Sequence, residues 1–396
     1  MCLSRVPPSG LWVAAEWSGM RAPRLRVLHV APFLWSGAGQ VITSLCESQS
    51  SRHSLAIVTT GRARDQRDWP AYRARLRQGG IPHSRINFFH RDAETFWMGV
   101  EQLRRVITRW QPDVVHTHAG VPSCAAAVVR QSGIDFTLVN HVYSWGIGRP
   151  AWMTEMDLSG HRQADAVICS ADAYERHLLD GGVGRRRLVK VTWGLAPASL
   201  EGSAPSSDRR VRAPRIGLVG RIEPRKGQLD LVKGFALVRR SLPAATLDLV
   251  GPIANEDYAA RIRQEIASCG LQPSVKLQGR VRSVPAIVSR WDLCVSLSSD
   301  EGQGLAILEA MALGVPVAAR PVAGVEDYFR PGVNGIAVRS SRARDVAAAV
   351  VEALGDRPRL ARMARRAQTH VRRRYSWEHT VYSIERVYER AQRWRD

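Results

Sequence analysis

The chain has 396 residues, is 45% hydrophobic and carries a formal net charge of +21. This length exceeds what one hydrophobic core usually supports, so we expect two domains, and the composition excludes a disordered or fibrous chain. No run approaches the roughly 18 apolar residues of a membrane-spanning helix, which excludes a polytopic membrane protein.

Residues 1–23 lack a periodic pattern, and we expect them to form a poorly ordered extension. Met20 stands just before the first expected strand and is a candidate for the true start. The apolar run 10–15 is too short for a secretory signal. The six cysteines are too far apart for a Cys-x-x-Cys site, which indicates reduced core cysteines and a cytoplasmic protein.

Strand-like apolar runs alternate with segments of helical period along residues 24–195, which is typical of a parallel sheet covered on both faces. We therefore expect an N-terminal Rossmann-like domain there. Its expected strands are 25–31, 55–59, 113–118, 136–141, 166–170 and 188–192. Its expected helices lie near 39–48, 93–110, 121–132, 151–163 and 172–180.

The alternation stops at residues 196–214, which are rich in Pro, Ser and charge, so we place an interdomain linker there. It restarts over residues 215–375, which predicts a second Rossmann-like domain. Residues 376–396 hold an amphipathic helix that need not belong to this domain and is able to pack back on the first. The strands expected in the second domain are 216–219, 246–250, 275–278, 293–297, 315–319 and 335–338.

Doubly wound domains bind ligands where their strands end, here in a cleft between two such domains. The strand 216–219 leads into the loop Gly220-Arg-Ile-Glu-Pro-Arg-Lys-Gly227 before a helix. Arg221 offers a planar fork of donors and Lys226 a point charge, which together suit a diphosphate. Taken alone, the loop is explained equally well as a basic surface turn.

A second loop, after the strand 293–297, favours the functional interpretation. Gly302 and Gly304 permit close approach of the backbone, and a helix that begins near Leu305 turns free N–H groups toward an anionic phosphate. Glu301 precedes this helix and Glu309 lies inside it, so both can face one ligand. Ionised carboxylates beside a phosphate site suit the hydroxyls of a sugar or a ribose.

These segments resemble glycosyltransferase family 4, a large family of retaining GT-B enzymes. The resemblance is strongest in the second half, and it implies two doubly wound Rossmann-like domains facing a central cleft, with the acceptor on the N-terminal side. It rests on Gly-Arg-x-x-x-x-Lys-Gly, Glu-Gly-x-Gly-Leu-x-x-x-Glu-Ala-Met-Ala-x-Gly-x-Pro-Val, Gly324-Val325-Glu326, Gly332-Val333-Asn334-Gly335 and Tyr375-Ser376-Trp377-Glu378.

The resemblance implies transfer of a sugar, with retention, from a UDP- or GDP-sugar to an acceptor hydroxyl in cell-envelope polysaccharide, lipopolysaccharide or glycolipid synthesis. Arg221 and Lys226 would bind the diphosphate and stabilise the leaving nucleotide. Glu301 would contact the donor sugar, and Glu309 would hold the ribose. No cofactor is implied, and a divalent metal ion is at most optional. The backbone lining the site would be that of Gly302, Gln303, Gly304 and Leu305.

Two positions depart from the family pattern. The family usually has an aromatic residue where Gln303 stands, so the identity of the donor sugar is not transferred. Trp193-Gly194 stand where the family often has Asn-Gly, so the resemblance does not assign a role to this loop on the hinge side.

The first half carries a glycine loop, Ser36-Gly-Ala-Gly-Gln40, after its first strand. The loop fails as a dinucleotide fingerprint because Ile42 takes the place of the third glycine. The resemblance implies instead that Gly37 and Gly39 approach the donor phosphate and the acceptor.

Two histidines follow the strand ends of the first half. The resemblance implies that His118 is an active-site residue near the donor sugar and that His141 lies beside it. For both, the alternative is a hydrogen-bonded structural histidine, as we expect for His116. No histidines cluster at metal-ligand spacing in the sequence, and we expect no metal site.

The positive charge is almost all arginine, since only four residues are lysine. A solvated basic exterior is the simpler interpretation. The functional alternative is peripheral contact with an anionic membrane, at the inner face of the cell membrane, near a lipid-linked acceptor. The arginine-rich stretches are 185–187, 209–210 and 372–374.

Other functions stay open at this point. A sugar-nucleotide epimerase or hydrolase can use the same fold, and an inactive relative would bind without turnover. A basic nucleic-acid-binding protein would carry base-reading modules, which we do not find in the sequence. The partners that we expect are a nucleotide sugar and an acceptor glycan or lipid-linked sugar, with no nucleic acid.

Overall fold

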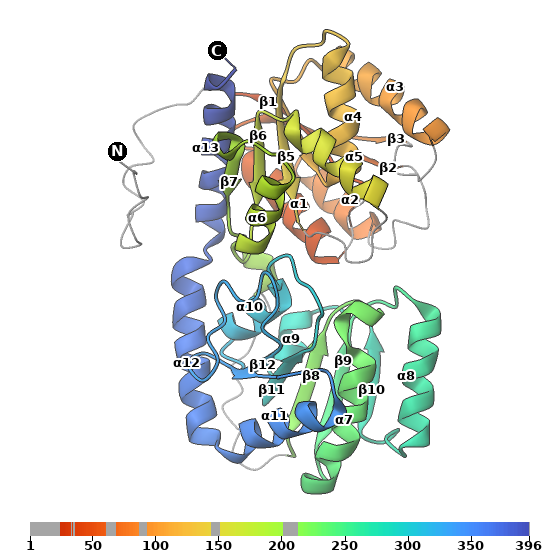
Figure 1. The fold of residues 1–396 in the computed structure, drawn as a ribbon, viewed down its shortest axis with the longest axis vertical. Coiled ribbons are helices and arrows are strands. Elements are labelled where there is room, and N and C mark those ends of the chain that lie inside the picture. The colour runs from red at the N-terminus through yellow and green to blue at the C-terminus, as the bar shows by residue number, and fades with distance from the viewer. Residues whose placement is uncertain are drawn as a thin grey trace.

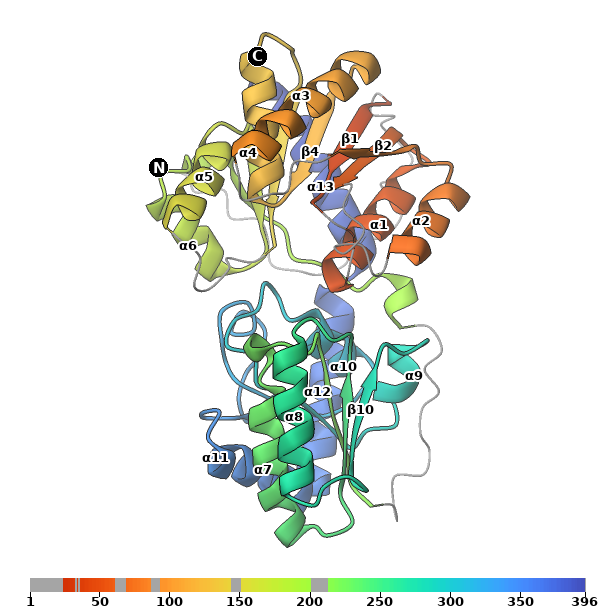
Figure 2. The same cartoon turned by 90° about the vertical axis from the view of Figure 1, so that its right-hand side faces the viewer.

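The computed structural model describes residues 24–32, 34, 36–60, 69–86, 93–143, 151–200 and 213–395. The expected N-terminal extension, with Met20, and most of the expected linker lie outside these ranges. The described chain forms two lobes, each built on one parallel sheet, and Figures 1 and 2 show them one above the other.

The first lobe is a seven-stranded sheet in the order β3-β2-β1-β4-β5-β6-β7. Its inner strands are buried, because α1 and α2 cover one face while α3, α4, α5 and α6 cover the other. Its elements are β1 (Arg26–Val30), α1 (Ser36–Gln49), β2 (Ser54–Thr60), α2 (Trp69–Gln78), β3 (His83–Ile86), α3 (Ala93–Trp110), β4 (Val114–His118), α4 (Gly120–Gln131), β5 (Thr137–Val142), α5 (Ala151–Arg162), β6 (Ala166–Cys169), α6 (Asp172–Asp180) and β7 (Leu188–Lys190).

The second lobe is a six-stranded sheet in the order β10-β9-β8-β11-β12-β13. A large core packs α7, α8 and α11 against one face, and a second core packs α10 against the other. Its elements are β8 (Arg215–Val219), α7 (Gln228–Ser241), β9 (Thr246–Val250), α8 (Glu256–Ser268), β10 (Val275–Gly279), α9 (Val284–Val288), β11 (Leu293–Ser296), α10 (Leu305–Ala312), β12 (Val317–Ala319), β13 (Ile336–Ala337), α11 (Ala343–Gly355) and α12 (Arg357–Arg374).

The chain crosses back to the first lobe at its end. Helix α13 (Trp377–Arg393) begins after α12, and the two helices run along one side of both lobes (Figure 1). Trp377, Ile384 and Tyr388 of α13 are buried in the core that also contains β1 and α1. The last helix therefore completes the N-terminal lobe.

The two sheets confirm the expected α/β class. In each sheet the strand order changes direction, between β1 and β4 in the first and between β8 and β11 in the second. Loops that leave neighbouring strands at such a point separate to opposite faces, which opens a ligand site at the carboxyl ends. Most of the expected site residues lie at the ends of these four strands or just after them, and His141 lies at the end of the next strand, β5.

Two elements of the first lobe, strand β3 and helix α2, were not expected from the sequence. Strand β3 has the polar sequence HSRI with only Ile86 buried, because it lies at the sheet edge, so no apolar run marks it. Helix α2 buries little beyond Leu76. The cysteines also differ from expectation, since Cys269 is exposed and Cys124 only partly buried, whereas Cys46 and the others described are buried.

Candidate active site

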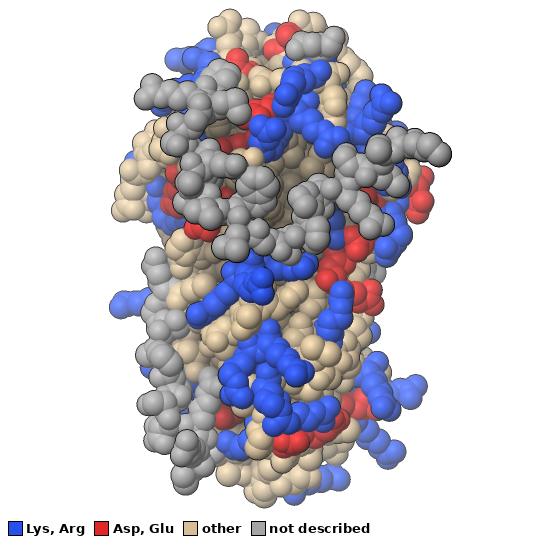
Figure 3. All heavy atoms as spheres, turned by 90° about the vertical axis from the view of Figure 1, so that its left-hand side faces the viewer, with Lys and Arg blue, Asp and Glu red and all other residues tan. Residues whose placement is uncertain are grey.

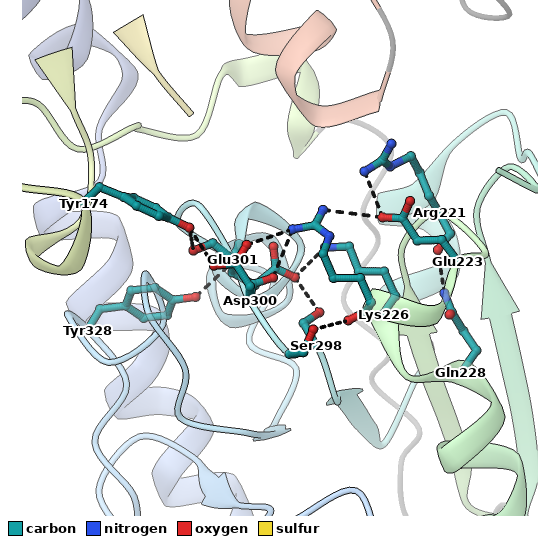
Figure 4. Close-up of polar contacts among 12 residues, drawn as sticks. Tyr174, Arg221, Glu223, Lys226, Gln228, Ser298, Asp300, Glu301 and Tyr328 are labelled. Atoms are coloured by element: carbon teal, nitrogen blue, oxygen red, sulfur yellow. Dashed lines mark hydrogen bonds and ion pairs between the residues drawn. The ribbon is translucent and has the colours of Figure 1, made fainter. Parts of the chain in front are cut away.

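Two loops of the second lobe meet through an ion pair. Lys226, at the end of the β8 loop, places its Nζ 2.5 Å from Oε1 of Glu301 in the β11 loop. The hydroxyl of Ser298 donates to the same carboxylate oxygen at 2.6 Å. Burial alone would raise the pKa of Glu301, but Lys226 and Ser298 hold it below its ordinary value, so Glu301 is ionised (Figure 4).

Arg221 stands at the other end of the β8 loop. Its guanidinium donates to Glu223 at 2.8 Å, and its backbone carbonyl accepts from Gln228 at 2.7 Å. Burial lowers the pKa of the Arg221 guanidinium, with Glu223 acting against the shift, and an arginine remains charged in such a setting. The loop therefore presents two cations, Arg221 and Lys226, on one side of the β11 loop.

Glycines allow the β11 loop its shape. Gly304, just before α10, has φ of +71° and so adopts a left-handed conformation that other residues rarely take. Gly324 has φ of +80°, and a Cβ there would lie 2.3 Å from the carbonyl oxygen of Glu301. The segment Gly324-Val325-Glu326 therefore packs directly against the backbone of the β11 loop. The contact leaves no room for a side chain at Gly324.

Glu309 lies one helical turn inside α10, apart from the Lys226 pair. Burial raises its pKa to about 7, with a hydrogen bond from Ser199 opposing the shift. Ser199 is buried in the short helix η4 (Pro197–Ser199) and accepts from Gln40 Nε2 at 2.6 Å. Ser199, which was expected only as part of the linker, thus connects Gln40 in α1 of the first lobe to the carboxylate of Glu309.

The glycine loop of the first lobe lies near the start of α10. A Cβ on Gly37 would come within 3.5 Å of the Leu305 side chain, so this loop approaches the expected phosphate site. Gly39 has a different role, because a Cβ there would lie 2.8 Å from the backbone of Leu34. Its lack of a side chain serves packing inside the loop.

Gln303 does not present its side chain to the cleft. It is 5% exposed, its Nε2 donates to the Trp193 carbonyl, and its Oε1 accepts from the Trp193 amide, both at 2.6 Å. The two positions that depart from the family pattern are therefore bonded to each other across the lobes. Trp193 in turn stacks on His141, with ring centroids 4.4 Å apart.

The expected histidines lie in the interior of the first lobe. His118 is 1% exposed and His141 is 0% exposed. His118 makes contacts of 3.0 Å to His29 through Nε2 and 2.7 Å to the Tyr143 hydroxyl through Nδ1. Both ring nitrogens of His118 thus have protein partners, and its expected contact with a donor sugar, like that of His141, stays a prediction.

Strand pairing also assembles a histidine cluster that sequence spacing did not show. His29 on β1 is paired with His116 on β4, and His118 lies two residues further on the same face. One nitrogen from each of these three rings lies within 4.8 Å of the others. Burial lowers the pKa of all three, so they are neutral, and in the described residues no carboxylate joins the group. His29 Nδ1 contacts His118 Nε2 at 3.0 Å, and His116 Nδ1 contacts the Tyr388 hydroxyl at 2.7 Å, so we interpret the cluster as a hydrogen-bonded network.

Several site neighbours were not found from the sequence. Tyr174 in α6 approaches Asp300, and Arg225 contacts the same carboxylate from the β8 loop. Arg225 was visible only as a third cation between Arg221 and Lys226. Tyr174 carries no sequence signal, because only the fold brings α6 to the β11 loop.

Comparisons with known proteins give matches to both lobes. Residues 204–370 match the family model of glycosyl transferases group 1, and residues 35–195 match that of Glycosyltransferase Family 4. The chain is 26% identical over 298 residues to a glycogen synthase of Mycobacterium tuberculosis, covering 72% of this chain and 70% of that protein. It is 30% identical over 313 residues to a D-inositol 3-phosphate glycosyltransferase of Nocardia farcinica, covering 75% of this chain and 65% of that protein.

Solved structures share the fold across most of the chain. Anabaena HepE, crystallised with UDP and glucose, superposes with a TM-score of 0.77 at 20% identity, covering 92% of this chain and 100% of HepE. Sucrose-phosphate synthase from Thermosynechococcus elongatus gives a TM-score of 0.77 at 20% identity, and the match covers 93% of this chain and 100% of the synthase chain.

Two Rossmann-like lobes, with cations, carboxylates and a helix start gathered at their strand ends, define a nucleotide-binding enzyme of the GT-B class. The two family models together match most of both lobes, and the chain belongs to the glycosyltransferases that they describe. It is a glycosyltransferase, and its donor substrate is a nucleotide sugar. None of the described helices is both long and apolar enough to cross a bilayer.

Proposed function

We propose that this enzyme transfers a sugar, with retention of configuration, from a UDP- or GDP-sugar to a hydroxyl of an acceptor glycan or lipid-linked sugar. The observation that carries the proposal is the meeting of Lys226 and Glu301 at 2.5 Å, beside Arg221 and the start of α10. This arrangement sets positive charge for a diphosphate next to a carboxylate for sugar hydroxyls.

The cations would act on the departing nucleotide. As the bond from sugar to diphosphate breaks, negative charge develops on the diphosphate oxygens. Arg221, Lys226 and the free N–H groups at Leu305 are fixed before the reaction, so they stabilise this charge with little reorganisation. A divalent metal ion would be optional for this step.

The carboxylates would hold the two sugars of the donor. Glu301 is ionised and its second oxygen can accept from donor-sugar hydroxyls while the first stays paired with Lys226. Glu309 would accept from the ribose hydroxyls, with Ser199 beside it. Neither carboxylate is assigned as a nucleophile, and the acceptor hydroxyl would attack from the face that the diphosphate leaves.

The basic surface supports a membrane-associated acceptor. Helix α12 has the sequence RPRLARMARRAQTHVRRR, with eight arginines and no acidic residue. Lysine and arginine side chains gather over the lower lobe on the face shown in Figure 3. Such a face is attracted to anionic headgroups. We therefore propose peripheral contact with the inner face of the cell membrane, where lipid-linked acceptors of envelope synthesis lie.

Product analysis with a labelled donor tests the proposed function. UDP-glucose is the first donor to try, because the fold matches HepE structures that contain UDP-glucose. We expect label in an acceptor glycan with the anomeric configuration of the donor. Release of free labelled sugar as the main product would identify a hydrolase, and a changed sugar still attached to the nucleotide would identify an epimerase.

A further inference from the structure

A path of polar contacts runs from the first lobe to the phosphate-binding cations. It starts at Tyr174 in α6, whose ring is buried at 3% exposure. Its hydroxyl lies 2.8 Å from Oδ1 of Asp300 and 2.9 Å from the carbonyl oxygen of Glu301. A residue of the N-terminal lobe thus contacts the β11 loop (residues 297–304, the donor loop) at the backbone of Glu301, the residue that carries the expected sugar-binding carboxylate.

The path continues through the carboxylates of the second lobe. The other oxygen of Asp300, Oδ2, accepts from Arg225 at 3.2 Å. Arg225 also lies 3.4 Å from Glu223, and Glu223 binds Arg221 at 2.8 Å (Figure 4). Asp300 therefore bonds the first lobe with one oxygen and the cation loop with the other.

A second set of contacts holds the same loop. The Ser170 hydroxyl donates to the Gly302 carbonyl at 3.1 Å, and Gln303 makes its two bonds of 2.6 Å to the Trp193 backbone. Residues 297–304 form neither helix nor strand in this structure. Contacts with the first lobe therefore supply hydrogen bonds that a helix or a strand would otherwise provide.

We propose that Tyr174 and Gln303 are positioning residues through which the N-terminal lobe orients Glu301, Arg225 and Arg221 for the donor. This inference rests on the proposed function. The donor site is then complete only while α6 and Trp193 contact the β11 loop. Separation of the lobes would release Asp300 and Gln303 together, and the loop would lose its geometry.

The variant Tyr174→Phe tests this inference, because it removes one hydroxyl and keeps the buried ring. Its matched control is Tyr258→Phe, which also loses a buried hydroxyl contact, of 3.0 Å to the Leu229 amide, but does not contact the donor loop. Hydrogen exchange of the segment 298–304 is measured first, since it requires no donor. We expect faster exchange there in Tyr174→Phe and wild-type exchange in Tyr258→Phe.

Transfer kinetics form the second arm, with UDP-glucose as the first donor and GDP-mannose as the second. We expect kcat/KM for the donor to fall about tenfold in Tyr174→Phe, as for loss of one hydrogen bond to a charged group, while the KM for the acceptor is unchanged. Unchanged exchange in Tyr174→Phe would overturn the inference, and so would faster exchange with wild-type kcat/KM. Failure of the wild type to turn over any donor would instead overturn the proposed function, and the exchange experiment would still decide the loop contact.

Discussion

Lys226 and Glu301 come from loops that follow different strands, yet their charged groups lie 2.5 Å apart. The pair brings the cation loop after β8 and the carboxylate loop after β11 to one point at the switch in strand order. It keeps Glu301 ionised despite burial, and it fixes the ammonium group of Lys226. One ion pair thus joins the two loops of the proposed donor site.

Lys226→Ala should abolish most of the transfer activity and leave the fold intact. The lysine is partly buried at the loop end, so its loss creates no large core cavity, but it removes a fixed positive charge near the diphosphate. We expect kcat to fall about 100-fold or more. Arg240→Ala, at an exposed position near the end of α7, is the matched control for loss of one cation. Steady-state kinetics check the effect, and activity within twofold of the wild type would remove Lys226 from the site.

Glu309 should make stability depend on pH. Burial raises its pKa from 4.5 to about 7, so between these values the folded state binds more protons than the unfolded chain. The contribution of Glu309 to the free energy of unfolding is therefore present at low pH and is lost as the pH rises through this window. Glu309→Gln lacks this titration. Urea unfolding at several pH values should show the variant gaining stability relative to the wild type as the pH rises, and a constant difference would refute the assignment.

Gly324→Ala should disorder the donor loop. The residue has φ of +80°, and a Cβ would lie 2.3 Å from the Glu301 carbonyl oxygen. Gly332→Ala is the control, because Gly332 has φ of +77° and no atom within 4 Å of an added Cβ. Both variants carry similar backbone strain of about 1 kcal/mol, but only Gly324→Ala should also lose donor binding. Equal donor affinity in the two variants, measured by calorimetry, would contradict the proposed support of the loop.

The basic face of α12 should bind anionic vesicles. Arg365 and Arg366 are exposed on this helix, and each is expected to contribute about 1 kcal/mol near a charged surface. The double variant Arg365→Gln/Arg366→Gln should bind vesicles containing phosphatidylglycerol about 30-fold more weakly than the wild type, since about 2 kcal/mol is lost. Arg261→Gln/Arg263→Gln, on α8 of the same lobe, is the matched pair. Vesicle binding is measured by co-sedimentation. If both double variants bind the vesicles equally weakly, the attraction is unspecific and the predicted role of α12 is wrong.

The sequence predicted the strands well where apolar runs marked them. Strand β9 and helix α3 agree with their expected bounds, because a buried strand and an amphipathic helix each have a clear period. Strand β3 was missed because an edge strand needs few apolar residues. The loops at the strand ends were predicted from charge and glycine spacing, and Lys226 and Glu301 do meet.

Contacts between the lobes could not be predicted from one sequence. The bonds from Tyr174 to Asp300 and from Gln303 to Trp193 join residues more than 100 positions apart, and no periodicity reports them. The histidine cluster likewise depends on the register of β1 against β4. Gln303 illustrates the limit, since its departure from the family pattern was visible but its partner was not.

Thermal unfolding with and without nucleotide sugars is the most direct test of the central claim. A ligand that binds only the native state raises the free energy of unfolding by RT ln(1 + [L]/Kd), and so raises the Tm. Among UDP-, GDP- and ADP-sugars, at least one should raise the Tm of the wild type and fail to raise that of Lys226→Ala. No shift with any of these donors, or the same shift in both proteins, would show that Arg221, Lys226, Glu301 and Glu309 do not form the donor site.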